Sequence, residues 1–236
     1  HRLARRRLAT DAHRDRRAIV KAAVVVAGLM VRCHALALTQ AGAKFALVID
    51  QDEVKGRALA ARHRGSKCAS DISAAVRKGS DIGAVHICTP PADHARQVSI
   101  ALDARIHCLV EKPLALNAAE TSMLLDKAEA AGCILCPSHQ FAFQKGVVSA
   151  IAGITRIGAL RQCLYVCCTA GADLSGERTA LVRDILPHPL SLMRRFAPER
   201  FPDFTWGARM TSEGEATIVA ESGTYALTML ISTHGR

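Results

Sequence analysis

The stretch Gly83–Val110, GAVHICTPPADHARQVSIALDARIHCLV, contains two short apolar runs separated by a helical segment. Residues 83–88 and 106–110 have the length and the continuous apolar character of buried strands. The helix between them, at 93–104, is entered through Thr89-Pro90-Pro91-Ala92. A helix that joins two buried strands is the usual crossover between neighbours in a parallel sheet. The stretch therefore predicts a βαβ unit.

The same alternation of strands and helices continues on both sides of this unit. Further strands are expected at 22–27, 45–49 and 133–137, and further helices at 35–41, 53–64, 71–78 and 117–131. Short strands alternating with helices predict a doubly wound α/β domain, a Rossmann fold, over residues 21–140. Ligands of such domains bind where the strands end, so the loops after Ala27, Ile49, Cys88 and Val110 are the candidate binding loops.

The pattern changes in the remaining part of the chain, residues 141–236. Strands are expected at 160–169, 204–210, 216–221 and 224–232, with a helical segment at 178–196 interrupted by two prolines. These segments predict an α+β domain with a mostly antiparallel sheet. We expect this second domain to be partial, because its last strand runs to within a few residues of Arg236.

Composition and charge exclude several other classes of protein. Half of the residues are apolar and 22% are charged, which excludes a disordered or low-complexity chain. Residues 1–21 carry six of the ten net positive charges, so we read 1–20 as a basic tail. Such a tail is typical of a solvated segment, and contact with an anionic surface such as nucleic acid is the alternative. The apolar run Ala22–Val31 is ten residues long, too short for the roughly 20 that span a bilayer.

The nine cysteines indicate the redox environment rather than a metal site. Their number is odd, most lie in apolar runs, and no secretion signal is evident, which favours a reducing compartment and a cytoplasmic protein. Cys133 and Cys136 have metal-like spacing, but neither a second pair nor a histidine cluster accompanies them. We therefore expect no metal ion.

The first binding loop carries a partial dinucleotide-binding pattern. The required G-x-G-x-x-G corresponds to Val26-Ala27-Gly28-Leu29-Met30-Val31, which keeps only the middle glycine, where the backbone approaches phosphate. We expect Gly28, Leu29 and Met30 to bind the cofactor. Val26 at the first position puts a β-branched side chain where a tight turn is needed.

Asp50 strengthens this interpretation. It ends a predicted strand 22 residues beyond Gly28, where an acidic residue binds the ribose 2′-hydroxyl of NAD. A carboxylate there repels a 2′-phosphate, so NAD is favoured over NADP. The alternative is that Asp50 merely begins the turn before the next helix.

The third and fourth loops hold the remaining candidate cofactor ligands, which are Cys88, Thr89, Pro90, His94, Glu111 and Lys112. Lys112 follows a predicted strand and precedes a proline. A lysine fixed in this way can exchange a proton with a substrate oxygen, whereas the simpler alternative is a surface Glu-Lys turn.

These loops resemble the Gfo/Idh/MocA oxidoreductases, in which a T-P-x-x-x-H loop is followed about 20 residues later by E-K-P. The resemblance extends from Lys21 to about His188, is strongest over 85–120, and includes His34 shortly after the glycine loop. It implies an N-terminal Rossmann domain, a nicotinamide cofactor and a sugar or polyol substrate. It also implies a C-terminal domain whose open sheet forms an oligomer interface, so we expect a homodimer or homotetramer. We expect no membrane partner, because the apolar run is short, and no nucleic-acid partner, because the body of the chain shows no basic patch.

The resemblance also implies the catalytic residues. Asp184 and His188 have the four-residue spacing of the family's second catalytic element, which places both on one helical face. His188 would accept the alcohol proton, Asp184 would orient substrate or imidazole, and Lys112 would polarise the oxygen and help to relay the proton. Gln140 would contact the substrate.

Three departures from the family pattern leave an alternative open. Val26 and Val31 replace family glycines, and family members usually exceed 300 residues. A catalytically impaired binding or regulatory relative with a decayed nucleotide loop is therefore the competing interpretation. Restoring glycine at position 26 distinguishes the two, since it should raise cofactor affinity only if the loop has decayed.

Overall fold

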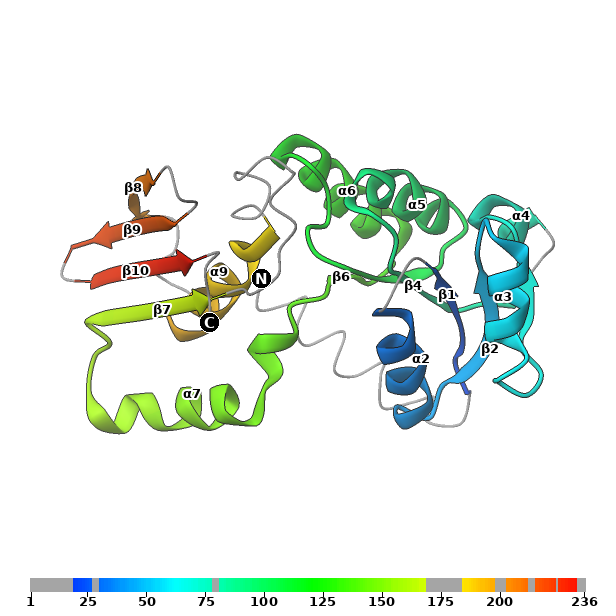
Figure 1. The fold of residues 1–236 in the computed structure, drawn as a ribbon, viewed down its shortest axis with the longest axis horizontal. Helices are drawn as coiled ribbons and strands as arrows, with labels where there is room; N and C mark the ends of the chain where they lie inside the picture. Colours follow the sequence, from blue (N-terminus) through cyan, green and yellow to red (C-terminus); the bar gives the residue numbers. More distant parts are fainter. Residues whose placement is uncertain are drawn as a thin grey trace. The chain divides into compact units, whose positions relative to one another are not determined.

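The computed structural model describes residues 19–26, 30–77, 81–168, 184–197, 203–211, 215–223 and 225–232. Its contacts divide the chain into two compact units, with the division between Ser138 and His139, close to the boundary expected after residue 140. Figure 1 shows the elements of each unit. Among the described residues, no helix is long and apolar enough to cross a membrane.

The first unit is built on a six-stranded parallel sheet in the order β3-β2-β1-β4-β5-β6. Its strands are β1 (Lys21–Val25), β2 (Lys44–Ile49), β3 (Lys67–Ala69), β4 (Ala84–Ile87), β5 (His107–Val110) and β6 (Leu135–Pro137). This is the strand order of a dinucleotide-binding Rossmann sheet, whose direction of winding reverses between β1 and β4. The predicted doubly wound α/β fold is confirmed.

Helices cover both faces of this sheet. They are α2 (Met30–Gln40), α3 (Glu53–Ala60), α4 (Ile72–Arg77), α5 (Pro91–Asp103) and α6 (Ala118–Ala131). One core joins α4, α5 and α6 to one face, and a second core joins α2 and α3 to the other. Because both faces are buried, the strands are continuously apolar, as the sequence indicated.

Local sequence explains where these helices begin and end. The Asp52 side chain caps α3 by accepting from the N–H groups of Val54 and Lys55, and Asn117 caps α6 in the same way from Glu120. Pro91 stands at the start of α5, where its missing N–H costs nothing. Gly132 ends α6 in the left-handed conformation that glycine adopts without strain.

The second unit contains a four-stranded sheet in the order β7-β10-β9-β8. Its elements are the 3₁₀ turn η1 (Gln140–Phe143), α7 (Lys145–Ile157), β7 (Gln162–Cys168), α9 (Pro187–Phe196), β8 (Thr205–Met210), β9 (Ala216–Ser222) and β10 (Tyr225–Ser232). β10 pairs with β7 in parallel and with β9 antiparallel, and β8 pairs with β9 antiparallel. The mostly antiparallel second sheet is thus confirmed.

The two faces of this second sheet differ in exposure. One face packs alternate residues of β9 and β10, including the fully buried Leu227 and Met229, with Met193 of α9. On the other face, Leu164, Val166 and Leu230 are 59%, 57% and 38% exposed. The second unit therefore presents an apolar sheet face to the solvent.

Candidate functional site

A cavity of about 680 Å³ lies at the carboxyl ends of the central strands of the first unit. Its walls include Val26 after β1, Asp50 after β2, Ser70 after β3, and Thr89 and Pro90 after β4. The volume falls within the range of roughly 300–1,000 Å³ typical of ligand sites. The cavity also lies where the winding of the sheet reverses, which is where Rossmann domains bind dinucleotides.

Asp50 brings a carboxylate to the wall of this cavity. Its Oδ1 accepts a hydrogen bond from the backbone N–H of Asp52 at 2.9 Å, which fixes the side chain at the end of β2. The carboxylate of Asp52 also lines the cavity, but it caps α3 and pairs with Lys55 at 2.9 Å. Asp50 is therefore the acidic group better placed to bind a ribose diol.

The approach of α3 to β2 and β3 helps to set the position of Asp50. A Cβ atom added at Gly56 would lie 2.7 Å from Cys68 Sγ and 3.0 Å from Asp50 Cβ. Only glycine allows α3 this close to the two strands. Gly56 was not recognised from the sequence, although glycine within a helix following an acidic strand end is a readable sign of close packing.

The two valines that replace the expected glycines have different roles. The N–H of Val26 donates to Ile49 O at 2.8 Å, so this residue continues the pairing of β1 with β2. The only non-glycine residue with positive φ among those described is Arg105, so Val26 has an ordinary backbone. Val31 is 3% exposed and fills the core between α2 and the sheet. Gly28 and Leu29 lie outside the described residues, and Met30 begins α2.

These residues fit the adenosine half of a dinucleotide. Val26, Val31, Leu59 and Ile72 supply apolar walls suited to a flat ring, while Asp50 supplies the acceptor for ribose hydroxyls. Cys88 is buried beside this edge, and burial raises the pKa of its thiol to about 12, followed by the effect of Glu111. Cys88 is therefore a neutral packing group rather than a nucleophile.

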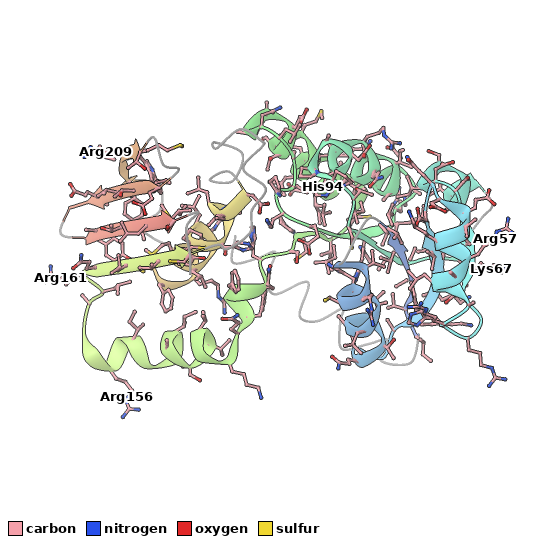
Figure 2. The ribbon with its side chains drawn as sticks, in the orientation of Figure 1. Arg57, Lys67, His94, Arg156, Arg161 and Arg209 are labelled. Atoms are coloured by element: carbon pink, nitrogen blue, oxygen red, sulfur yellow. The ribbon has the colours of Figure 1, made fainter. Side chains whose placement is uncertain are left out.

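His94 is fully buried and joins the third loop to the fourth (Figure 2). Its Nδ1 lies 2.7 Å from Pro113 O and its Nε2 lies 2.7 Å from Thr89 O. A neutral imidazole carries one N–H group, so His94 donates to one of these two carbonyl oxygens, and its tautomer decides which. Thr89 is further fixed by a 2.7 Å hydrogen bond from its hydroxyl to Gln97 Oε1. His94 thus holds the two loops together, and direct contact with the cofactor stays a prediction.

Glu111 is held by several donors at the end of β5. Its Oε1 lies 2.9 Å from His34 Nε2, and its Oε2 accepts from the backbone N–H of Lys112 at 3.3 Å. Burial alone would raise its pKa, but hydrogen bonds and charge from His34, with further hydrogen bonds from Ser138 and Lys112, lower the pKa overall. Glu111 is therefore an ionised anchor, and Lys112 follows it, partly exposed, at the same edge of the sheet.

His86 of β4 was given no role from the sequence, but it contacts this anchor. Its Nδ1 lies 3.1 Å from His34 Nδ1, and the two rings pack edge to face with centroids 5.2 Å apart. Burial, followed by the nearby His34, lowers the pKa of His86 to about 4. A polar side chain in an otherwise apolar parallel strand requires a buried partner, and that was the available signal.

The remaining predicted site residues belong to the second unit. Gln140 is exposed in η1, and the His188 ring packs edge to face on Phe141 with centroids 4.6 Å apart. The helical segment expected over 178–196, interrupted by two prolines, has a turn at Leu186 directly before α9 begins at Pro187, and the helix continues through Pro189. Asp184 precedes that turn, and Leu186 itself keeps helical backbone angles. The first part of that predicted helix lies outside the described residues.

No group of three or more histidine, cysteine, aspartate or glutamate side chains is arranged to hold a metal ion in the described part of the chain. Cys133 and Cys136 are free thiols, and burial raises the pKa of each.

Comparison with known proteins identifies the fold and the family pattern. The GFO_IDH_MocA family, described as an oxidoreductase family with an NAD-binding Rossmann fold, matches residues 20–139. Inositol 2-dehydrogenase of Rhodococcus erythropolis is 33% identical over 114 residues, which are 48% of this chain and 32% of that protein. The 4-carboxy-2-hydroxymuconate-6-semialdehyde dehydrogenase of a Sphingobium species is 28% identical over 119 residues, 47% of this chain and 38% of that protein. The matched stretches thus span well under half of these relatives.

Solved structures share the fold over most of the chain. Myo-inositol dehydrogenase from Lactobacillus casei, in complex with NAD(H) and myo-inositol, aligns with 92% of this chain and 68% of its own, with a TM-score of 0.78 and 18% identity. An oxidoreductase from Agrobacterium radiobacter, in complex with NAD⁺, L-tartaric acid and magnesium, aligns over 93% and 68% with a TM-score of 0.79 and 17% identity.

Proposed function

The chain belongs to the Gfo/Idh/MocA family of oxidoreductases with an NAD-binding Rossmann fold, and on that premise we propose that it transfers a hydride between a nicotinamide cofactor and a secondary alcohol of a sugar or cyclitol. The observation that carries this proposal is the alignment of three features along one sheet edge: the cavity with Asp50, the Thr89-Pro90 loop and Lys112. When bound, the cofactor supplies the hydride chemistry, and the protein supplies position and proton transfer.

NAD is the cofactor that this cavity favours. The Asp50 carboxylate accepts hydrogen bonds from a ribose diol and repels a 2′-phosphate. Three cations line the cavity: Lys55 pairs with Asp52, Arg96 pairs with Asp93 at 3.4 Å, and Arg32 of α2 has no ion pair among the described residues. The preference for NAD therefore rests on the Asp50 carboxylate.

The proposed chemistry divides its tasks among three side chains. Lys112 donates a hydrogen bond to the substrate oxygen and polarises it. His188 takes the hydroxyl proton as the alcohol becomes a carbonyl, and Asp184 orients the substrate or the imidazole. Gln140 contacts a further hydroxyl group. The names of the inositol dehydrogenases among the relatives and solved structures support a polyhydroxylated ring as substrate.

The open face of the second sheet supports self-association. Leu164, Val166 and Leu230 lie on the face opposite the core and remain exposed. We propose that a second copy of the chain covers this face, giving a homodimer or a homotetramer.

Titration calorimetry with NAD⁺, NADH, NADP⁺ and NADPH tests the proposal, after a denatured sample has been checked for retained cofactor. We expect micromolar affinity for NAD(H) and weak affinity for NADP(H). Turnover of a sugar or cyclitol by the wild type, lost in Lys112→Ala, would then support the catalytic assignment. If the protein neither binds a nicotinamide cofactor nor retains one, the alternative of a non-catalytic relative is favoured.

A further inference from the structure

The backbone on both sides of Lys112 is held by buried histidines. Glu111, immediately before it, is hydrogen-bonded to His34 of α2, and the carbonyl oxygen of Pro113, immediately after it, lies 2.7 Å from His94 Nδ1 of α5. His34 and His94 are 6% and 0% exposed, so neither contact competes strongly with water. The backbone of Lys112 therefore lies between two fixed points.

The His34 contact also joins Lys112 to the helix that begins at the dinucleotide loop. α2 starts at Met30, directly after that loop, and His34 lies about one turn into the helix. A displacement of the first turn of α2 therefore moves His34, and with it the carboxylate of Glu111. His94 makes no such link, since it belongs to α5.

His86 completes the link by fixing the His34 ring. Because His34 Nε2 donates to a carboxylate, the Nδ1–Nδ1 contact of 3.1 Å needs one nitrogen to donate and the other to accept. Each ring then fixes the orientation of the other, in the way that a hydrogen bond to one ring nitrogen fixes the orientation of a metal-binding histidine. Cys88, the other titratable group near Glu111, is a neutral thiol.

We propose that His34 and His86 are positioning residues which set Lys112 through Glu111 and make its placement depend on the start of α2. The inference rests on the proposed function for its catalytic consequence, but the placement of Lys112 is testable without turnover. The start of α2 is thereby connected to the lysine that polarises the substrate oxygen through the side chains of His34, His86 and Glu111.

Two polar substitutions of similar size separate this role from simple packing. His34→Gln extends its amide far enough to replace Nε2 and keep the bond to Glu111, whereas His34→Asn replaces only Nδ1 and loses that bond. At position 86, His86→Asn keeps a hydrogen-bond partner for Nδ1 of His34, and His86→Leu removes that partner. His63→Gln, a histidine in the same unit whose ring contacts Phe45, is the control.

The first readout is the ¹³C signal of Lys112 after reductive methylation with ¹³C-formaldehyde, assigned by its absence in Lys112→Arg. We expect His34→Asn and His86→Leu to shift this signal, and His34→Gln, His86→Asn and His63→Gln to resemble the wild type. NAD⁺ affinity by calorimetry should change less than threefold in all variants. Where a substrate is known, His34→Asn should lower kcat/KM by about 100-fold, as expected for misplacement by about 1 Å, with most of the loss in kcat.

Two outcomes overturn the proposal. One is a Lys112 signal that is unchanged in His34→Asn, and the other is an equal shift in His34→Asn and His34→Gln, which would indicate packing alone. If His86→Leu does not fold, the two His34 variants decide the question. Failure of the wild type to bind NAD⁺ would count against the proposed function, whereas the Lys112 signal would still report whether the histidines place the lysine.

Discussion

At the scale of single residues, Asp50 determines which nicotinamide cofactor the cavity accepts. Asp50→Asn keeps an oxygen for the N–H of Asp52 but removes the charge. Because hydrogen bonds to charged groups contribute about 1.5–3 kcal/mol, we expect NAD⁺ affinity to fall by roughly tenfold to 100-fold. NADP⁺ affinity should rise, since the repulsion of its 2′-phosphate is removed.

Calorimetric titration of both cofactors checks this change in selectivity. Asp126→Asn is the matched control, because it removes the same charge from an exposed position in α6 that does not line the cavity. An unchanged ratio of the two affinities in Asp50→Asn would mean that Asp50 serves only the turn after β2.

His86 makes stability depend on pH in a defined window. Its pKa is lowered from 6.5 to about 4, chiefly by burial and then by His34, so the unfolded chain binds a proton more readily than the folded one. The free energy of unfolding is therefore full above pH 6.5 and decreases as the pH falls towards about 4. Glu111, whose pKa is also lowered, adds a loss only below its ordinary value of 4.5.

Urea unfolding between pH 7 and pH 5 measures the contribution of His86 before carboxylates titrate. We expect His86→Asn to have a smaller slope of unfolding free energy against pH than the wild type over this range. Equal slopes in the two proteins would assign the effect to other histidines.

At the scale of elements, the packing of α3 links stability to cofactor binding. Alanine in place of a helical glycine normally stabilises by about 1 kcal/mol. In Gly56→Ala, however, the new Cβ meets Cys68 Sγ at 2.7 Å and Asp50 Cβ at 3.0 Å. We expect a loss of about 1–3 kcal/mol from overpacking, together with weaker NAD⁺ binding as Asp50 is displaced.

Gly153→Ala in α7 is the matched control, because nothing lies within 4 Å of its added Cβ. Urea unfolding should show Gly153→Ala at least as stable as the wild type, with NAD⁺ affinity unchanged. Stabilisation by Gly56→Ala would contradict the close approach of α3.

The elements also explain how far the sequence alone could lead. Strands such as β1 and β4 were predictable, because burial on both faces requires a continuous apolar run. β3 was missed because three residues, Lys67–Ala69, give no measurable period. The interruption before α9 was expected from Pro187, but none occurs at Pro189, because proline is tolerated in the first turn of a helix.

The residues of the candidate site also divide into those that the sequence predicts and those that it does not. Asp50, Thr89 and Lys112 were predictable, since each stands at the end of an apolar run and the carboxyl ends of parallel strands share one edge. The His34–His86 contact was not, because it depends on the packing of α2 over β4, two elements far apart in sequence. Spacing along the chain fixes neither the distance between such elements nor their orientation.

At the scale of the whole molecule, the proposed reaction needs both units. The cavity and Lys112 belong to the first unit, while His188 and Asp184 belong to the second. Cofactor affinity should therefore report on the first unit, and turnover on both.

A variant such as His188→Asn is expected to keep NAD⁺ binding within about threefold while kcat falls by roughly 100-fold or more, the usual contribution of a general base. Calorimetry and steady-state kinetics separate the two effects, and a matching loss of NAD⁺ affinity would argue against a catalytic role.

Self-association is the other proposed property of the whole molecule. Leu164 and Val166 project from β7 with more than half of their surface exposed, and a stable interface buries about 800 Å² on each partner with a dry apolar centre. Replacing both by lysine places two charges in that centre. We expect light scattering coupled to size exclusion to show a shift of mass towards the monomer. The control is Leu116→Lys, at a position 65% exposed in the first unit, which should leave the mass unchanged. If the double variant still assembles like the wild type, the open sheet face is not the interface.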